Sequence, residues 1–324
     1  MLEKMAPALL AGMPVIVKPA TATCQVTELA FQMIIASGLL PVGAVQLITG
    51  DLGNLLDHLG GQDVVSFTGS EATGRHLRTH PALIQNAVHF MAEQDSLNAS
   101  VLGADVAVGS AEFDLFVKEV HREITVKAGQ KCTAVRRVMV PDHLLDPVQA
   151  ALIERLANTP IGNPRHPDTR MGALVSLSQR RDVLGKAAQI GAEADCVFGA
   201  GDMPMLIDAD AEKGAFVAPK LFRCETPDQA QVVHDIEAFG PVSTLMGYRD
   251  AGHASQLLNL GQGSLVASVF TADAGFARDM VMGSAAYHGR LYFNNAASAK
   301  ESTGHGSPMP QLVHGGPGRA GGGE

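Results

Sequence analysis

The chain has 324 residues, of which 46% are hydrophobic and 18% are charged, and its formal net charge is −9. This composition excludes an intrinsically disordered protein, and the apolar runs in the sequence are too short to predict a membrane-spanning helix. The negative charge argues against a nucleic-acid partner, because proteins that bind the phosphate backbone usually carry a basic surface. We therefore expect a globular protein, with two domains and a small-molecule partner.

Strand and helix signals alternate in the first part of the chain. Short apolar strand patterns lie at residues 14–19, 44–49, 64–69 and 87–93, and helical patterns lie at 24–38, 52–59 and 71–79. Parallel strands need crossover connections, which helices usually supply, so this alternation predicts parallel βαβ units. Residues 1–98 are therefore interpreted as a dinucleotide-binding domain.

A second domain is predicted over residues 99–324. Its helical patterns lie at 112–127, 145–157 and 176–191, and its strand patterns lie at 135–141, 195–198, 215–222 and within 234–248. The final segment, residues 300–324, is rich in glycine and proline. By composition it is a linker, but glycines mixed with His and Arg also fit an ordered binding loop.

The cysteines indicate the redox environment. Cys24, Cys132, Cys196 and Cys224 are far apart and form no C-x-x-C pair, which favours neither a metal site nor a disulfide framework. The N-terminal segment runs from a short apolar patch into a strand pattern without a signal-peptide cleavage region. We expect a cytoplasmic protein with reduced thiols and no bound metal.

Cys132 differs from the other cysteines because it lies in a polar loop, KAGQKCTAVRR (residues 127–137), before a strand pattern. A lone cysteine is most often a buried structural thiol, and Cys24 and Cys196 fit that interpretation. Around Cys132, however, Gly129 allows close approach of the backbone, and cationic neighbours can stabilise a thiolate. Cys132 is therefore the candidate nucleophile.

Glu93 is the candidate partner of this thiol. A nucleophile that forms a covalent intermediate needs a group that activates water or the thiol itself. Glu93 ends the apolar pattern AVHFMAE, at the carboxyl end where parallel sheets bind ligands. A solvent-exposed carboxylate at a strand end is the alternative, and this segment alone does not decide between them.

Two features suit a nucleotide. Gly69 and Gly74 flank a strand-to-helix turn in FTGSEATGR, where backbone amides at the helix start can hold a phosphate. The spacing is weak evidence, since it matches neither the G-x-G-x-x-G fingerprint nor a P-loop. Lys18 follows an apolar strand pattern, where a lysine most often marks only the exposed strand end. It could instead contact a ribose or a phosphate.

The segments VKPATAT, FTGSEATGR, GQKCTA and EAFGPV occur in this order, and together they resemble the aldehyde dehydrogenase superfamily over nearly the whole chain. The resemblance implies an α/β fold, with a partial Rossmann-type cofactor domain followed by an α/β catalytic domain. It implies that Cys132 is the nucleophile and Glu93 the general base. It further implies cofactor contacts from Lys18 at the adenosine ribose, from Gly69, Ser70 and Gly74 beside the pyrophosphate, and from Glu237 and Phe239 at the nicotinamide ribose.

The implied reaction oxidises an aldehyde to a carboxylic acid. Cys132 would add to the aldehyde, the thiohemiacetal would pass a hydride to the nicotinamide, and Glu93 would activate the water that hydrolyses the thioester. NAD-selective members often have a glutamate three residues after the lysine, where this chain has Thr21. A neutral hydroxyl does not repel a 2′-phosphate, so NADP is the expected cofactor and NAD the alternative.

The run AEQDSLNASVLG departs from the usual Glu-Leu-Gly-Gly sequence after the base. With the cysteine loop and the C-terminal segment, it resembles the dehydrogenase part of bifunctional phenylacetate-degradation enzymes of the PaaZ type. That resemblance implies a ring-opened CoA-thioester semialdehyde as substrate, of the 3-oxo-5,6-dehydrosuberyl-CoA semialdehyde type. Semialdehyde dehydrogenases of benzoyl-CoA breakdown share similar motifs and are the alternative.

The start of the chain differs from the family. Family members have a long segment before the KPA strand, including an asparagine that binds the oxyanion, whereas this sequence begins almost at that strand. The hydratase domain of the bifunctional enzymes also has no counterpart in these residues. We therefore expect little or no activity from the 324 residues alone, and a homo-oligomer in the full-length form. An inactive fragment and an ester hydrolase are the competing hypotheses.

Overall fold

The computed structural model describes residues 1–201, 203–309, 312 and 314–322. The chain divides into two compact units. The smaller unit comprises Met1–Phe67 and Arg75–Met91, and the larger unit comprises Thr68–Gly74 and Ala92–Glu324. Each unit has a hydrophobic core of its own. The assignment of cofactor binding to residues 1–98 and of catalysis to residues 99–324 stays a prediction.

The smaller unit contains a parallel βαβ unit. Strand β1 pairs in parallel with β2, with Val15 opposite Val45, and α2 is the crossover between them. Met5, Phe31 and Val45 form the small core. The elements of residues 1–93, of which β3, α3 and β4 lie partly in the larger unit, are α1 (Leu2–Leu10), β1 (Val15–Val17), η1 (Thr21–Thr23), α2 (Cys24–Ala36), β2 (Val45–Leu47), η2 (Leu55–His58), β3 (Val64–Thr68), α3 (Glu71–Arg78), α4 (Pro81–Gln85) and β4 (His89–Glu93). Strands β3 and β4 form a second pair.

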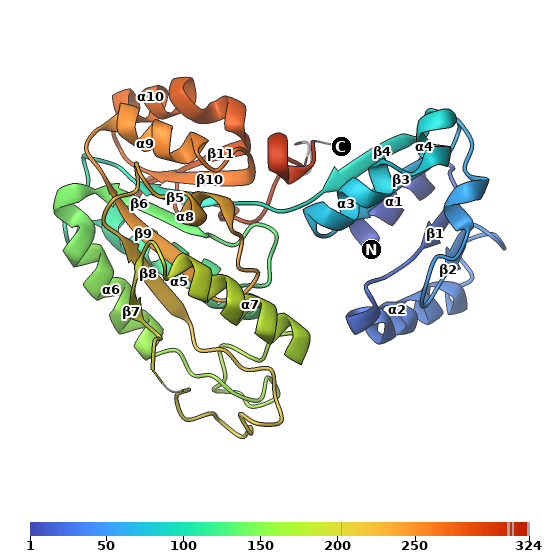
Figure 1. Ribbon diagram of the computed structural model, residues 1–324, viewed down its shortest axis with the longest axis horizontal. Helices are drawn as coiled ribbons and strands as arrows, with labels where there is room; N and C mark the ends of the chain where they lie inside the picture. The colour runs from blue at the N-terminus through green and yellow to red at the C-terminus, as the bar shows by residue number, and fades with distance from the viewer. Residues whose placement is uncertain (202, 310–311, 313, 323–324) are drawn as a thin grey trace. The chain divides into compact units, whose positions relative to one another are not determined.

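The larger unit is built around one sheet with helices on both faces (Figure 1). Within the described residues this sheet has seven strands in the order β11-β10-β5-β6-β9-β8-β7, all parallel to their neighbours except β7 with β8. Its strands are β5 (Ala99–Leu102), β6 (Arg137–Pro141), β7 (Asp195–Phe198), β8 (Lys220–Cys224), β9 (Val242–Tyr248), β10 (Ser264–Phe270) and β11 (His288–Asn294).

Several of the longer helices around these strands begin at polar caps. The longer ones are α5 (Ala111–Thr125), α6 (Leu145–Ala157), α7 (Leu177–Ile190), α9 (Ala251–Asn259) and α10 (Ala274–Ser284), and the short ones are η3 (Val126–Gly129), η4 (Asp142–Leu144), α8 (Val232–Asp235), η5 (Ala285–Tyr287) and η6 (Gly318–Ala320). Ser110, Ser176, Asp250 and Asp273 cap α5, α7, α9 and α10, because each side-chain oxygen accepts a hydrogen bond from a first-turn amide.

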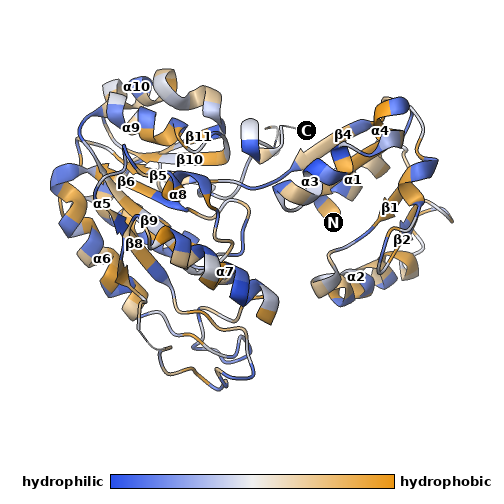
Figure 2. Ribbon diagram, in the orientation of Figure 1, coloured by the Kyte–Doolittle hydropathy of each residue, from blue (hydrophilic) through white to orange (hydrophobic). Residues whose placement is uncertain are grey.

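Alternate residues of the central strands pack on opposite faces of the sheet. In β6, Met139 belongs to the apolar cluster that includes α7, α9 and α10, whereas Val138 and Val140 belong to the cluster that includes α5 and α6. All residues of β6 are buried, which explains why its sequence is apolar on both faces. Figure 2 shows this hydrophobic colouring along the central strands.

The α/β fold predicted from the sequence is confirmed, and most of the predicted elements lie within a few residues of the observed ones. The segment after β9 went unpredicted, although it supplies α9, β10, α10 and β11. The C-terminal segment is an ordered loop in its described part, since His305 and Ala320 are both fully buried. Among the described residues, no helix is both long enough and apolar enough to cross a membrane.

Candidate active site

The loop that carries Cys132 begins with an unusual backbone turn. Lys127, Ala128 and Gly129 have φ angles of 54°, 52° and 66°, in the left-handed region that side chains with a Cβ rarely adopt. At Gly129 an added Cβ would lie 2.1 Å from the carbonyl oxygen of Gly240. Only glycine fits there, so this turn fixes the path of the chain from α5 to Cys132.

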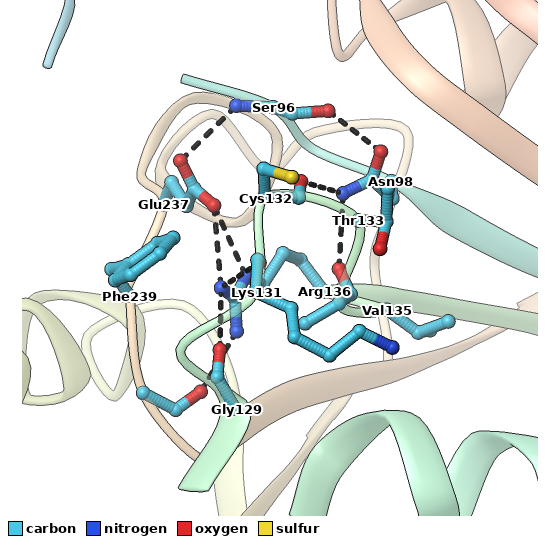
Figure 3. Close-up of polar contacts among 12 residues, drawn as sticks. Ser96, Asn98, Gly129, Lys131, Cys132, Thr133, Val135, Arg136, Glu237 and Phe239 are labelled. Atoms are coloured by element: carbon cyan, nitrogen blue, oxygen red, sulfur yellow. Dashed lines mark hydrogen bonds and ion pairs between the residues drawn. The ribbon is translucent and has the colours of Figure 1, made fainter. Parts of the chain in front are cut away.

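Asn98 holds the backbone of the nucleophile loop at two points (Figure 3). Its side-chain Nδ2 donates to the carbonyl of Cys132 at 2.7 Å and to that of Ala134 at 3.1 Å. Its Oδ1 accepts from the Ser96 hydroxyl at 2.6 Å and from the Val266 amide at 3.1 Å. Asn98 is fully buried, so these bonds satisfy a side chain that would otherwise be costly to bury.

Arg136 is the buried cation beside this loop. Its guanidinium donates to the carbonyls of Gly240 at 2.8 Å and Gly129 at 2.9 Å, and it forms an ion pair with Glu237 at 3.3 Å. The guanidinium carbon lies 5.5 Å from the centre of the Phe239 ring, within the range of a cation–π contact. Arg136 therefore ties the turn at Gly129 to the segment that contains Glu237 and Phe239 (Figure 3).

Both carboxylate oxygens of Glu237 are engaged in this structure. Oε1 accepts from Arg136, and Oε2 accepts from the backbone amide of Ser96 at 3.1 Å. Burial raises the pKa of Glu237, and attraction to Arg136 and the bond from Ser96 oppose that rise. A ligand hydroxyl at Glu237 would have to share or replace one of these bonds.

Two arginines, and not the adjacent Lys131, are the cations that attract a thiolate at Cys132. Lys131 donates to the buried carboxylate of Glu123 at 2.6 Å, so its charge is paired there. Burial lowers the pKa of Arg136 and of Arg290, and attraction to a Cys132 thiolate opposes that lowering in both. The attraction is mutual, so these two guanidinium groups favour the thiolate form of Cys132.

His305 links the C-terminal segment to the nucleophile loop. Its Nε2 lies 2.8 Å from the Thr133 carbonyl, which can only accept, so Nε2 carries the proton and Nδ1 accepts from the Ser268 hydroxyl. Burial, with smaller contributions from Lys131 and Arg290, lowers the pKa of His305 to about 3. The imidazole is therefore a neutral structural link beside Cys132.

Glu93, Cys132 and His314 converge at one point of the larger unit. Each offers one thiol, carboxylate or imidazole atom, and these atoms all lie within 4.8 Å of one another. His314 Nε2 lies 3.2 Å from Glu93 Oε1, and the Glu93 residue is only 5% exposed. Glu93 is therefore not a solvent-exposed strand end.

The same three side chains are types that can ligate a metal ion. Nδ1 of His314, however, is buried without a hydrogen-bond partner in the part of the chain that the structure describes. A metal-bound imidazole almost always donates its second N–H to a carboxylate, a carbonyl or water. The geometry therefore favours a carboxylate–imidazole pair beside a thiol over a metal centre.

The turn predicted to hold a pyrophosphate also belongs to the larger unit. The Gly69 amide donates to the Glu93 carbonyl at 3.0 Å, and the Ser70 hydroxyl accepts from the Thr73 amide at 3.3 Å at the start of α3. Gly74 is buried, and an added Cβ would lie 2.0 Å from Gln94 Nε2. Gly69 and Ser70 themselves are exposed.

Lys18 and Thr21 lie in the smaller unit, and both are exposed. Lys18 directly follows β1, and Thr21 begins η1. The other cysteines also differ from the sequence-based expectation in part, since Cys24 and Cys196 are half-buried and Cys224 is the fully buried one. Burial alone therefore does not distinguish Cys132, whereas its charged neighbours do.

Sequence reasoning missed Asn98, Arg136 and His314. Asn98 was visible as a polar residue directly before the apolar strand ASVL, and Arg136 as a charge directly before the strand RVMVP. His314 had a weaker signal, since it precedes a glycine-rich run that also reads as a linker. Their partners are distant in sequence, which a local pattern cannot reveal.

The chain belongs to the aldehyde dehydrogenase family, whose model matches residues 1–307. It is 44% identical to 3,4-dehydroadipyl-CoA semialdehyde dehydrogenase from Aromatoleum evansii over 315 residues, which are 97% of this chain and 61% of that protein. It is also 50% identical over 154 residues to Protein MaoC from Klebsiella aerogenes, covering 48% of this chain and 44% of that protein. The chain thus spans about three fifths, or less, of these relatives.

Solved structures show the same fold. A point mutant of betaine aldehyde dehydrogenase from Staphylococcus aureus in complex with NAD+ is 27% identical, with a TM-score of 0.83 over 98% of this chain and 61% of that chain. Succinic semialdehyde dehydrogenase from Streptococcus pyogenes in complex with NADP+ is 20% identical, with a TM-score of 0.81 over 98% of this chain and 64% of that chain. The aldehyde dehydrogenase fold is therefore confirmed.

Proposed function

We propose that this chain is the dehydrogenase part of an enzyme that oxidises an aldehyde to a carboxylic acid with NADP. One observation carries the proposal: ligand-type atoms of Cys132, Glu93 and His314 all lie within 4.8 Å of one another. A thiol and a carboxylate this close can act in turn on one substrate carbon. Membership of the aldehyde dehydrogenase family supports the same reaction.

In the proposed reaction the Cys132 thiolate attacks the aldehyde carbon, and the π electrons of the carbonyl bond move to oxygen. NADP, when bound, supplies the acceptor for the hydride that leaves this carbon, which is thereby oxidised to a thioester. Glu93 takes a proton from the water molecule that attacks the thioester carbon. The carbon–sulfur bond then breaks, and Cys132 leaves as the thiolate while the carboxylic acid is released.

The chain's own residues fit a dinucleotide. Gly69 and Ser70 are exposed at the start of α3, where a phosphate can accept from backbone amides, and we assign them to the pyrophosphate with Gly74. We assign Lys18 and Thr21 to the adenosine ribose and its phosphate. Glu237 and Phe239 are assigned to the nicotinamide ribose, and ribose binding would exchange a bond that Glu237 now accepts.

Thr21 is the basis of the NADP preference. A hydroxyl at this position does not repel a 2′-phosphate, and the Lys18 ammonium can pair with it. We expect a higher kcat/KM with NADP than with NAD, and the change Thr21→Glu should move selectivity towards NAD. Equal or better catalytic efficiency with NAD in the unchanged protein would contradict this preference.

The proposed substrate is a CoA-thioester semialdehyde from aromatic degradation. The C-terminal segment and the cysteine loop support the 3-oxo-5,6-dehydrosuberyl-CoA semialdehyde of phenylacetate catabolism. The 44% identity to a relative named for 3,4-dehydroadipyl-CoA semialdehyde supports that compound as a second candidate. Both candidates share a reactive aldehyde and an acidic CoA group, so one assay can compare them.

The test follows NADPH formation with each CoA semialdehyde, with the 324 residues and with an extended form that includes whatever open reading frame adjoins them on either side. We expect turnover in the extended form and its loss in Cys132→Ser, by about a thousandfold or more, with NADP binding retained. The matched variant Cys196→Ser should keep its activity. Full turnover in Cys132→Ser would exclude the proposed nucleophile.

Two rival functions give different outcomes in this assay. An ester hydrolase that uses Cys132 and Glu93 would cleave esters without a cofactor and form no NADPH. An inactive fragment would form no product in the short form, and the extended form would show whether the site is complete there. We also propose a cytoplasmic location, because a thiolate nucleophile needs a reducing compartment. A homo-oligomeric full-length form is part of the same proposal.

A further inference from the structure

His314 lies against Glu93 in a pocket of low exposure. Its Nε2 is 3.2 Å from Glu93 Oε1, and the two side chains are 14% and 6% exposed. The two residues are 221 positions apart in the sequence, so the fold and not a local turn brings them together. Water has little access to the contact, and a hydrogen bond there is stronger than at the surface.

The chemistry of the two groups fixes the direction of this bond. A general base is ionised and its carboxylate can only accept hydrogen bonds, so with Glu93 in that role the proton of the contact lies on Nε2 of His314. In the neutral imidazole Nδ1 is then a bare acceptor, and within the described residues it is buried without a partner. An unpaired buried acceptor has a free-energy cost, so a contact with another function accounts for His314 better than one that only adds stability.

We propose that His314 is a positioning residue for the general base Glu93. Its Nε2–H holds Oε1 of Glu93 and so fixes the orientation of the carboxylate that takes the proton of the attacking water. The C-terminal segment that carries His314 also contacts the residue directly after Glu93, because the Gln94 amide donates to the Ala320 carbonyl at 3.1 Å. This inference rests on the proposed function, in which Glu93 acts in thioester hydrolysis.

The proposal separates the two halves of the reaction. Attack by Cys132 and departure of the hydride do not need Glu93 as a base towards water, whereas hydrolysis of the thioester does. A misplacement of about 1 Å in a catalytic group can lower a rate about a hundredfold. Loss of His314 should therefore slow hydrolysis selectively and leave the first turnover of NADPH formation intact.

The experiment compares His314→Phe and His314→Gln with the unchanged protein, in the form extended on both sides. Phenylalanine fills the space without an N–H, whereas the glutamine amide places an N–H close to the position of Nε2. The first-turnover burst of NADPH and the decay of the acyl-enzyme, quenched and measured by mass spectrometry, are followed separately. His143→Phe, at an exposed histidine in η4, is the matched control.

We expect His314→Phe to keep the NADPH burst and to hydrolyse the acyl-enzyme at least about tenfold more slowly. The upper limit of this loss is the ~10²–10⁴-fold that a positioned base contributes in full. His314→Gln should recover most of that rate. Unchanged hydrolysis in His314→Phe, no recovery in His314→Gln, or loss of the burst itself in both variants would overturn the positioning role. Absence of any NADPH formation by the unchanged protein would instead overturn the proposed function.

Discussion

Asn98 reaches the carbonyl of Cys132 from 34 positions away in the sequence, and it connects the nucleophile loop to the start of β5. The change Asn98→Leu keeps a similar volume but leaves two carbonyls of the nucleophile loop and the amide of Val266 in β10 without their partner. Since one unsatisfied buried group costs about 1–3 kcal/mol, we expect the free energy of unfolding to fall by at least about 2 kcal/mol. Urea denaturation measures it.

The matched control is Asn158→Leu, at an exposed asparagine that donates to a helix carbonyl. It should change the free energy of unfolding by no more than about 0.5 kcal/mol, as surface changes usually do. The rate at which iodoacetamide alkylates Cys132 should also change in the Asn98→Leu protein and stay the same in the Asn158→Leu protein. Equal stability of the two variants would show that Asn98 does not hold the loop.

The buried ion pair between Arg136 and Glu237 allows a second test of the residues around the nucleophile loop. Its side chains are 4% and 7% exposed, so removal of one partner leaves a buried charge or forces the other to change protonation. We expect Arg136→Leu to destabilise the fold by about 3–5 kcal/mol, and the double change Arg136→Leu with Glu237→Leu to destabilise it less. Thermal unfolding of the single and double variants decides, and strictly additive losses would refute the coupling.

The loop between α5 and β6 turns through three consecutive left-handed residues, and Gly129 lies at its closest contact. The change Gly129→Ala should cost more than the ~1–2 kcal/mol of a left-handed backbone, because the new Cβ would lie 2.1 Å from the Gly240 carbonyl oxygen. Gly109→Ala is the matched control, since Gly109 has a φ of 78° but open space around its Cβ.

The two glycine variants should therefore separate strain from collision. We expect the free energy of unfolding to fall in Gly109→Ala only by the cost of the left-handed backbone, and to fall further in Gly129→Ala. Only Gly129→Ala should also lower the reactivity of Cys132. The differences are measured by urea denaturation and by alkylation rates. Equal losses in both variants would mean that the close approach of Gly240 does not matter.

Elements with a clear period were predictable from the sequence, and the segment after β9 shows why others were not. Asp250 and Asp273 are ordinary helix caps, and LVASVF is an apolar run, so α9, β10 and α10 had visible signals. In the site, Glu93 was found because it ends an apolar strand, and Cys132 because it lies in a polar loop with a glycine and cationic neighbours. His314 and Arg136 were not, because their partners lie 221 and 101 positions away and only the folded sheet brings them together.

Three buried histidines should make the stability of the whole molecule depend on pH. Burial lowers the pKa of His234 to about 4 and of His288 and His305 to about 3, from an ordinary value of 6.5. Between these values the unfolded chain binds protons that the folded chain does not. The stability that they contribute is therefore complete above pH 6.5 and is lost as the pH falls towards 3.

Urea midpoints between pH 7 and pH 4 measure this dependence. We expect the urea midpoint to fall as the pH is lowered. The change His288→Gln should make the midpoint depend less steeply on pH, because it removes one of the three titrating groups. His143→Gln, at an exposed histidine, should leave the slope as it was. A midpoint that rises as the pH falls would have the wrong sign for neutral buried imidazoles.

The central claim is that Cys132 carries the substrate as an oxidised thioester. The most direct measurement uses Glu93→Gln, in the form extended on both sides, to slow hydrolysis, with a CoA semialdehyde and NADP, and then maps the adduct by peptide mass spectrometry. We predict an adduct on the Cys132 peptide whose added mass is that of the aldehyde less two hydrogen atoms, formed only when NADP is present. An adduct on another cysteine, or one formed equally without NADP, would contradict the account.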